Sequence, residues 1–423
     1  MKERRYDNIS ETLITETLSN GLTINIVPRP AFTKSFAMFA TDYGGADRRF
    51  KLGGSWIDTP AGVAHFLEHK MFDMPYGNAL SVLSANGASP NAFTSSGMTA
   101  YHFECTERFE DNLRVLLSFV STPYFTAESV QKEQGIIGQE ICMVEDNPGF
   151  VIYNNLLRCL YEYNPVRDSV AGSIESIAEI TDKTLYHCHE MFYNPSNMTL
   201  AVVGNADPQR VIAMAQEILP KEPGEVPERD YGAPEAAIPH QAKISAEMEV
   251  SAPQFMFGAR IRPERDGIAR LRQSIIGEIS LAMLLGPSSP VFNRLYSDGL
   301  LNGSLDYELD YTAGTAMLLA GGESRDVGAA MDEIISELRR VTADGLDRDL
   351  FINSKKSYFG DMLRNTGSFS TLAQALIEGA FADFCPLDAF EIIEGITVQD
   401  VQAFVFDNIV PEKLALSVIE PKK

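Results

Sequence analysis

Two histidines and a glutamate stand at a spacing that suits a metal-dependent hydrolase. The run His65-Phe66-Leu67-Glu68-His69 places the histidines four residues apart, with the glutamate three residues after the first. On an α-helix, at about 100 degrees per residue, these three side chains fall within one arc of the surface. Both imidazoles can then hold one metal ion while the carboxylate takes a proton from an attacking water. The pattern predicts metal-assisted hydrolysis, with zinc as the metal.

Such a zinc site needs a third protein ligand, and the sequence offers two carboxylates. The remaining histidines lack a matching helical context, so a carboxylate is expected. A helix predicted from Thr126 to about Val144 carries Glu133 and Glu140 two turns apart on one face. Gly135 and Gly138 lie between them and suggest close approach to a neighbouring element. Two solvated glutamates on a surface helix are the alternative interpretation.

A second metal-like cluster, His187-Cys188-His189, is a weaker candidate. Residues two apart on a helix point about 200 degrees from each other, so these histidines cannot share an ion there. The sequence therefore favours a single metal site.

The zinc motif itself is predicted to lie on a helix from about Pro60 to Phe72. Asp58 or Thr59 can serve as its N-cap, with Pro60 at the first helical position. Strand patterns precede it at residues 22–27 and 36–40. The loop between these strands and the helix is rich in glycine: Gly44, Gly45, Gly53 and Gly54.

Strands and helices alternate through the rest of the first half. A helix is predicted over residues 109–120, before the helix that carries the glutamates, and a buried strand over residues 199–204. The second half repeats this order, with a strand near residues 254–259 and helices at residues 328–338 and 347–363. An internal duplication is therefore expected.

A proline-rich stretch separates the two halves. It contains Pro220, Pro223, Pro227, Pro234 and Pro239 among acidic and small residues. This composition is typical of a stiff, extended linker. The predicted organisation is a first domain over residues 1–218, a linker over 219–243 and a second domain over 244–423, because 423 residues exceed a single hydrophobic core.

Charge and composition exclude several classes of protein. A hydrophobic content of 45% argues against wholesale disorder, and a net charge of -23 disfavours a nucleic-acid partner. That acidity suits a basic peptide substrate, although solubility alone explains it. No signal peptide and no run approaching a membrane span is recognised, and five widely spaced cysteines fit reduced thiols. A cytoplasmic protein without a membrane partner is expected.

The zinc motif with Glu140 downstream resembles the inverted-motif zinc peptidases, the family that includes pitrilysin and the mitochondrial processing peptidase. The resemblance covers nearly the whole chain and includes the runs at residues 87–95 and 194–199. The length matches the half-length bacterial branch of that family. The resemblance implies an α/β (α+β) fold of two homologous domains, each a mixed, mostly antiparallel sheet covered by helices.

Site residues follow from the same resemblance. It implies that His65, His69 and Glu140 hold one zinc ion per chain and that Glu68 is the general base. It makes Glu133 a carboxylate beside the metal that orients a ligand. Asn91 and Ala92 match the start of an edge strand on which the family lays an extended peptide. The implied activity is a zinc endopeptidase acting on short or unfolded peptides.

One departure from the family pattern concerns an Arg and a Tyr that contact the substrate in the second homologous domain. In the matching stretch Tyr296 stands at the Arg position and Gly303 at the Tyr position. Arg294 could replace the pair only with a shifted register. Each missing hydrogen-bond donor is worth roughly 3 to 4 kcal/mol to the developing oxyanion. A homologous partner subunit that supplies the pair, or a homodimer, is therefore expected.

Two other classes of function stay open. Some members of the family are non-catalytic assembly subunits, but those typically lose part of the zinc motif, which is complete here. Two histidines and one glutamate also match the facial triad of non-haem iron oxygenases. Such sites usually lie on strands of a barrel, and the sequence contains no jelly-roll pattern.

Overall fold

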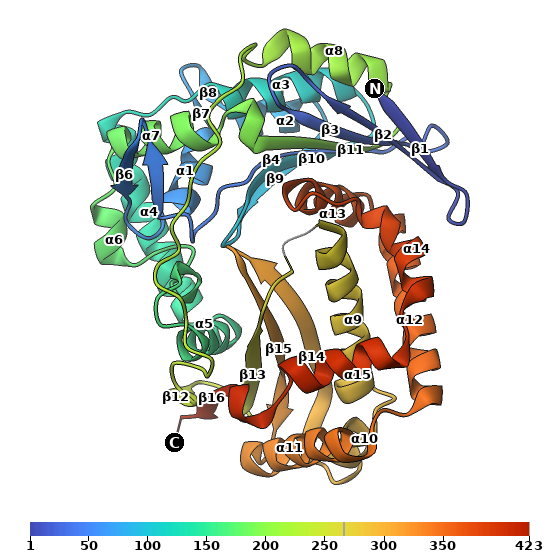
Figure 1. The fold of residues 1–423 in the computed structure, drawn as a ribbon. Helices are drawn as coiled ribbons and strands as arrows, with labels where there is room; N and C mark the ends of the chain where they lie inside the picture. Colours follow the sequence, from blue (N-terminus) through green and yellow to red (C-terminus); the bar gives the residue numbers. More distant parts are fainter. Residues whose placement is uncertain (265–266, 423) are drawn as a thin grey trace. The chain divides into compact units, whose positions relative to one another are not determined.

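The structure is a computed structural model that describes residues 1–264 and 267–422 (Figure 1). The chain divides into two compact units, each assembled from three segments. The first unit comprises Met1–Ile141, Ser169–Tyr231 and Leu363–Leu387. The second comprises Cys142–Asp168, Gly232–Met362 and Asp388–Lys423.

The first unit is built on a seven-stranded sheet. In spatial order its strands are β1 (Lys2–Tyr6), β2 (Glu11–Thr17), β3 (Thr23–Pro28), β11 (Met198–Gly204), β4 (Ser35–Thr41), β10 (Thr99–Cys105) and β9 (Ser89–Thr94). Only the β3–β11 pair is parallel. Every residue of β4 and β11 is buried, as expected for central strands covered on both faces. At the other extreme, β9 is an edge strand.

Helices cover both faces of this sheet, as Figure 1 shows for α3 and α8 above it and α13 below. Helices α1, α3 and α8 contact one face, and α13 contacts β4 and β11 from the other. Two short hairpins complete the unit, β5 (Arg49–Leu52) with β6 (Ser55–Asp58) and β7 (Asp73–Met74) with β8 (Gly77–Asn78). The helices are α1 (Val63–Met71), α2 (Ala79–Ala85), α3 (Phe109–Ser121), α4 (Ala127–Glu145), α6 (Ile174–Ala178), α7 (Asp182–Phe192), α8 (Pro208–Ile218) and α13 (Phe369–Phe381).

The second unit has a five-stranded sheet in the order β12 (Lys243–Met248), β16 (Ala415–Pro421), β13 (Gln254–Ile261), β15 (Thr315–Ser324) and β14 (Leu301–Thr312). One helix, α5 (Pro148–Leu160), covers β12, β16 and β13, and α9 (Gly267–Leu285) packs on β14. The remaining helices are α10 (Pro290–Ser297), α11 (Val327–Asp344), α12 (Arg348–Gly367), α14 (Ala389–Ile392) and α15 (Val398–Asn408). Both units thus show the expected mixed sheet covered by helices.

The compact units differ from the continuous domains 1–218 and 244–423. Helix α5 comes from the first half of the chain but buries its apolar side in the second unit, where Leu156 and Leu160 join Met317 and Leu319. Conversely, α13 comes from the second half and covers the sheet of the first unit. The chain does pass from the first unit to the second within the predicted linker, between Tyr231 and Gly232.

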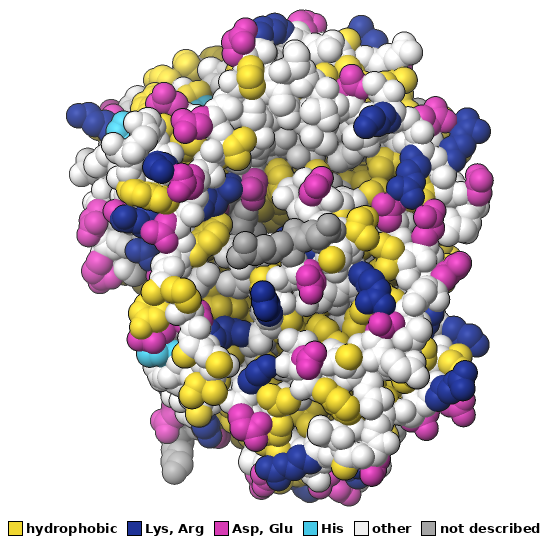
Figure 2. Space-filling model, in the orientation of Figure 1, with side chains coloured by type: hydrophobic (Ala, Val, Ile, Leu, Met, Phe, Trp, Pro, Cys, Tyr) yellow, Lys and Arg dark blue, Asp and Glu magenta, His cyan; other side chains and the backbone are white. Residues whose placement is uncertain are grey.

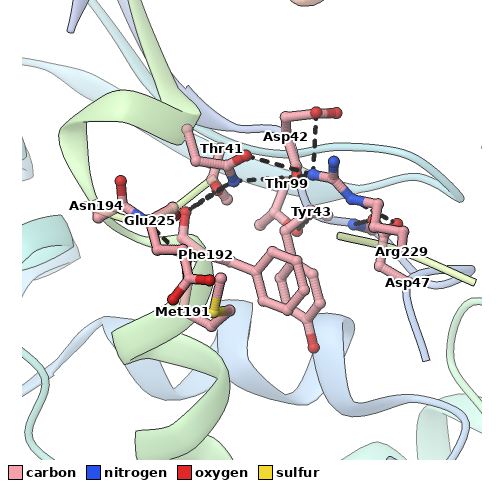
Figure 3. A network of polar contacts seen from close by, with 12 residues as sticks. Thr41, Asp42, Tyr43, Asp47, Thr99, Met191, Phe192, Asn194, Glu225 and Arg229 are labelled. Carbon is pink, nitrogen blue, oxygen red and sulfur yellow. Dashed lines mark hydrogen bonds and ion pairs between the residues drawn. The ribbon is translucent and has the colours of Figure 1, made fainter. Parts of the chain in front are cut away.

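A buried polar network fixes the linker to the first unit (Figure 3). The Arg229 guanidinium lies 3.0 Å from carboxylate oxygens of both Asp42 and Asp47. The Gly44 N–H donates to the other oxygen of Asp47 at 2.8 Å, and the Gly45 N–H donates to the Ser95 carbonyl at 2.9 Å. The linker charge therefore stabilises the glycine-rich loop, which in turn holds the turn between β9 and β10.

One stretch corrects the expectation that no segment approaches a membrane span. By length and composition alone, residues Gly267–Ser297, which include α9 and α10, are long and apolar enough to cross a membrane. The mean hydropathy of their most apolar part is 1.4. In this structure 67% of the most apolar window is buried inside the protein. That burial is typical of a core helix, because its apolar side chains already contact protein.

Charged side chains of both signs are interspersed on the face drawn in Figure 2. The net charge of -23 is therefore not gathered into one acidic field on that face. A dispersed excess of acidic groups keeps a protein soluble without selecting a particular ligand. This arrangement favours the solubility interpretation of the acidity for the face that is seen.

Glu278 of α9 should make the second unit sensitive to pH. Its carboxylate accepts a hydrogen bond from the Leu309 N–H at 2.9 Å, and burial raises its pKa from 4.5 to about 7. The folded state therefore holds a proton that the unfolded state has lost. The stability gained from this proton is complete below pH 4.5 and is lost as the pH rises through about 7.

Glu278→Gln keeps an acceptor for Leu309 but cannot ionise. We expect its free energy of unfolding to match that of the parent protein near pH 4.5 and to exceed it by roughly 3 kcal/mol at pH 8. Urea unfolding at both pH values measures the difference. The exposed Glu247→Gln on β12 is the control, and an equal rise in that variant would contradict the assignment to Glu278.

Candidate active site

The helix that carries the zinc motif begins later than predicted. Helix α1 starts after Gly62, which has a φ of 93° and offers no side-chain cap, so the predicted cap at Asp58 or Thr59 with Pro60 in the first turn is wrong. A Cβ atom on Gly62 would lie 2.7 Å from the Ala171 carbonyl oxygen. Close approach of another part of the chain therefore sets the start of the helix.

The structure brings together the three predicted metal ligands. His65 and His69 project from α1, and Glu140 projects from α4. The Glu140 carboxylate lies 3.6 Å from His65 Nε2 and 3.5 Å from His69 Nε2. All three candidate ligand atoms lie within 4.8 Å of one another. Tetrahedral zinc with ligands at roughly 2.0–2.1 Å separates them by roughly 3.4 Å, so the set fits this ion.

Glu133 lies beside the three candidate ligands and contacts one of them. Its Oε1 is 3.1 Å from His69 Nδ1. When Nδ1–H donates to this carboxylate, Nε2 of the same ring is left free to bind a metal. Burial raises the pKa of Glu133, but the hydrogen bond to His69 and the charge of Lys70 outweigh it and lower the pKa. Glu133 therefore stays ionised and orients the imidazole.

The surroundings shift the pKa values of His69 and Glu140 in opposite directions. Burial lowers the pKa of His69, but the hydrogen bond to Glu133 and the surrounding carboxylates raise it overall. The hydrogen bond to His65 lowers the pKa of Glu140. Negative charge therefore collects where a cation would sit.

Glu68 occupies the position expected of a general base. The side chain is 8% exposed, and its Oε2 accepts a hydrogen bond from Thr94 Oγ1 at 2.8 Å. Burial raises the pKa of Glu68, while Thr94 and the two histidines partly oppose the rise. A raised pKa brings a carboxylate closer to the value that suits proton transfer near neutral pH.

Sequence reasoning missed the role of Thr94. This residue ends the edge strand β9 and ties that strand to Glu68. Its only sequence signal was its place at the end of the run that contains Asn91 and Ala92. The contact places the tip of β9 beside the candidate base.

Asn91 and Ala92 lie on β9, the edge strand of the sheet. The Ala92 N–H donates to Asn91 Oδ1 at 2.9 Å. Because an edge strand has one row of unpaired backbone groups, an extended peptide can add to it. The structure thus offers an edge at the residues that the sequence singled out.

The interpretation of Gly135 and Gly138 was wrong. A Cβ atom at either position would meet nothing within 4 Å, so neither glycine marks close packing. Helix α4 instead buries Val130, Ile137 and Ile141. These apolar side chains hold the helix so that Glu133 and Glu140 face α1.

The second histidine cluster plays a structural part. On α7, His189 is buried with Nε2 3.1 Å from the Val120 carbonyl oxygen, and burial lowers its pKa to about 4. His187 is exposed. Within the described residues, the group suited to a metal ion consists of His65, His69 and Glu140.

The stretch that departs from the family's clamp lies in α10 and β14. Arg294 makes ion pairs with Glu333 at 3.1 Å and Glu337 at 2.8 Å on α11. Tyr296 is 63% exposed, and a Cβ atom on Gly303 would meet nothing within 4 Å. The Arg294 guanidinium is therefore already engaged within its own unit.

Comparison with known proteins identifies the family of this chain. Residues 52–173 match the family model described as insulinase (peptidase family M16), and residues 179–358 match the model described as the peptidase M16 inactive domain. The uncharacterized zinc protease YmfH of Bacillus subtilis (strain 168) is 35% identical over 433 residues, which cover 100% of both chains.

Solved structures show the same fold. An M16-like peptidase from Alicyclobacillus acidocaldarius is 31% identical, with a TM-score of 0.93 over 97% of this chain and 99% of that one. Pitrilysin is 18% identical, with a TM-score of 0.78 over 99% of this chain and 46% of its own length. With matching models in both halves and a relative aligned from end to end, this chain belongs to peptidase family M16.

Proposed function

We propose that this chain is a zinc-dependent endopeptidase that hydrolyses peptide bonds in short or unfolded peptides. The observation that carries the proposal is the grouping of His65, His69 and Glu140 beside a buried Glu68. Three protein ligands with an adjacent carboxylate are typical of catalytic zinc sites, whereas structural sites usually have four ligands. One zinc ion per chain is proposed.

Each residue has a distinct task in this proposal. Zinc held by the three ligands supplies Lewis acidity, which lowers the pKa of water and polarises a carbonyl. Glu68 accepts the proton of the attacking water, and Thr94 holds its carboxylate in place. An extended peptide adds to β9 at Asn91 and Ala92 by main-chain hydrogen bonds. The link between Thr94 and Glu68 supports this placement, because it puts the base beside the end of the strand.

We further propose that the chain is the catalytic member of a pair with a homologous subunit. The partner supplies the Arg and Tyr that this chain lacks at Tyr296 and Gly303. The engagement of Arg294 by Glu333 and Glu337 supports the proposal, because it leaves this guanidinium bonded within its own unit. A homodimer cannot supply the pair from these positions.

The test compares the purified chain alone with the chain co-purified with its companion from native cells. We expect one zinc per chain in both, rapid cleavage of an unstructured peptide by the pair, and little by the single chain. A single chain that turns over at roughly 1 per second or more would contradict the need for a partner. No cleavage by either preparation, with zinc bound, would favour the non-catalytic assembly subunit.

A cytoplasmic location is also proposed. None of the five cysteines forms a disulfide, which supports a reducing compartment. Because Cys105, Cys159 and Cys188 are buried, the native cells should be lysed in denaturant with an alkylating reagent, and mass spectrometry should then find all five cysteines modified. A disulfide in that protein would contradict the proposed location.

A further inference from the structure

A buried lysine follows directly after the second zinc-motif histidine. Lys70 is 1% exposed, although lysine is almost never fully buried unless it is paired. Two carboxylates compensate its charge. Asp73 of β7 contacts the ammonium directly, and Glu133 Oε2 lies 3.7 Å from Nζ. The lysine therefore joins the hairpin after α1 to the carboxylate beside the metal site.

Glu133 connects this ammonium to a metal ligand. One carboxylate oxygen is 3.1 Å from His69 Nδ1, and the other faces Lys70. A carboxylate held on both sides has little rotational freedom. Its orientation fixes the ring of His69, whose Nε2 lies 3.5 Å from Glu140.

The other imidazole lacks such support. His65 Nδ1 is buried and has no hydrogen-bond partner among the residues that the structure describes. Outer partners of metal-binding histidines fix the tautomer and ring orientation. Of the two histidines, His69 has such an outer partner, Glu133. The orientation of His69 therefore depends on the residues that hold the Glu133 carboxylate.

We propose that Lys70 is a positioning residue of the metal site. Its ammonium, held by Asp73, fixes the Glu133 carboxylate so that His69 presents Nε2 to the metal. The inference rests on the proposed zinc site and adds a residue to it. Lys70 acts through Glu133 and is not one of the three grouped candidate ligands.

The test measures the zinc dissociation constant by equilibrium competition with a chromophoric chelator. Lys70→Met fills a similar volume without charge. We expect zinc affinity to fall about 10- to 100-fold, the range found when outer partners of ligands are removed. Adding Lys70→Met to Glu133→Gln should change affinity less than threefold, because the effect passes through Glu133. A Lys70→Met affinity within threefold of the parent, or an equal loss in the Glu133→Gln background, would overturn the proposal.

Arg29→Met is the matched control for loss of a buried cation. Arg29 lies in the same unit, and its side chain is 10% exposed and pairs with Glu11 at 2.6 Å. Zinc affinity should stay within threefold of the parent in this variant, even where the apo protein melts earlier. A zinc loss equal to that of Lys70→Met would assign the effect to general destabilisation and overturn the proposal.

A second variant covers the case in which Lys70→Met does not fold. Asp73→Asn keeps the Lys70 ammonium but removes the negative charge that pairs with it. Because the Asp73 side chain is 38% exposed, this change should disturb folding less than Lys70→Met. Zinc affinity should fall more than threefold but less than in Glu133→Gln, and unchanged affinity would overturn the proposal. His69→Ala separates this failure from that of the zinc site itself. Zinc affinity unchanged in His69→Ala would contradict the site, whatever Lys70 does.

Discussion

Glu68→Gln is expected to lower peptidase turnover by about 100- to 10,000-fold, the usual contribution of a general base. The amide oxygen of glutamine can still accept the hydrogen bond from Thr94, so the side chain stays in place but cannot take a proton. Zinc affinity should change little, because Glu68 is not among the three grouped ligands. Steady-state cleavage of an unstructured peptide by the active assembly measures the loss.

Glu104→Gln is the control for this experiment. Glu104 lies on β10 in the same unit, is 44% exposed and pairs with Lys34 at 2.8 Å. Its replacement should leave turnover unchanged. If Glu68→Gln kept a tenth or more of the parent turnover, Glu68 would not be the base.

Glu140→Gln is expected to weaken zinc binding by more than about 100-fold, beyond the range for residues that only orient a ligand. The carboxylate approaches both histidines, at 3.6 and 3.5 Å, and supplies the one negative charge among the proposed ligands. A neutral amide offers a weaker ligand at the same place. The zinc dissociation constant, measured by chelator competition, checks the prediction.

Glu133→Gln is a matched comparison, since it makes the same change two turns earlier on the same face of α4. It should weaken zinc binding only about 10- to 100-fold, because Glu133 contacts Nδ1 of His69 and not the metal position. Equal losses in the two variants would contradict the assignment of Glu140 as ligand and Glu133 as its neighbour.

Local spacing was sufficient for the inner part of the site. Residues four apart on a helix share a face, so His65 and His69 had to meet once α1 formed. The seven-residue spacing of Glu133 and Glu140 placed both on one face of α4 in the same way. Which of the two approached the metal position depended on where α4 crosses α1, which a helical repeat does not specify.

Capping and glycine rules were less informative, because tertiary contacts overrode them. The sequence offered Asp58 and Thr59 as caps, yet α1 begins at Val63, directly after Gly62, where the Ala171 carbonyl leaves no room for a side chain. Tertiary contacts also set the division into two units, which the sequence did not predict. Apolar faces on α5 and α13 predict burial, but nothing in either helix states which sheet it will cover.

The sequence by itself determined the candidate residues of the site: a pair of histidines and a glutamate at helical spacing, and two further carboxylates on one face of a second helix. These follow from residue type and short-range periodicity. The tertiary structure decided how these residues are supported, by Thr94 on Glu68 and by Asp73 and Lys70 behind Glu133. Asp73 and Lys70 are only three residues apart, but the contacts of Thr94 with Glu68 and of Lys70 with Glu133 join residues far apart in the chain, and packing sets those partners.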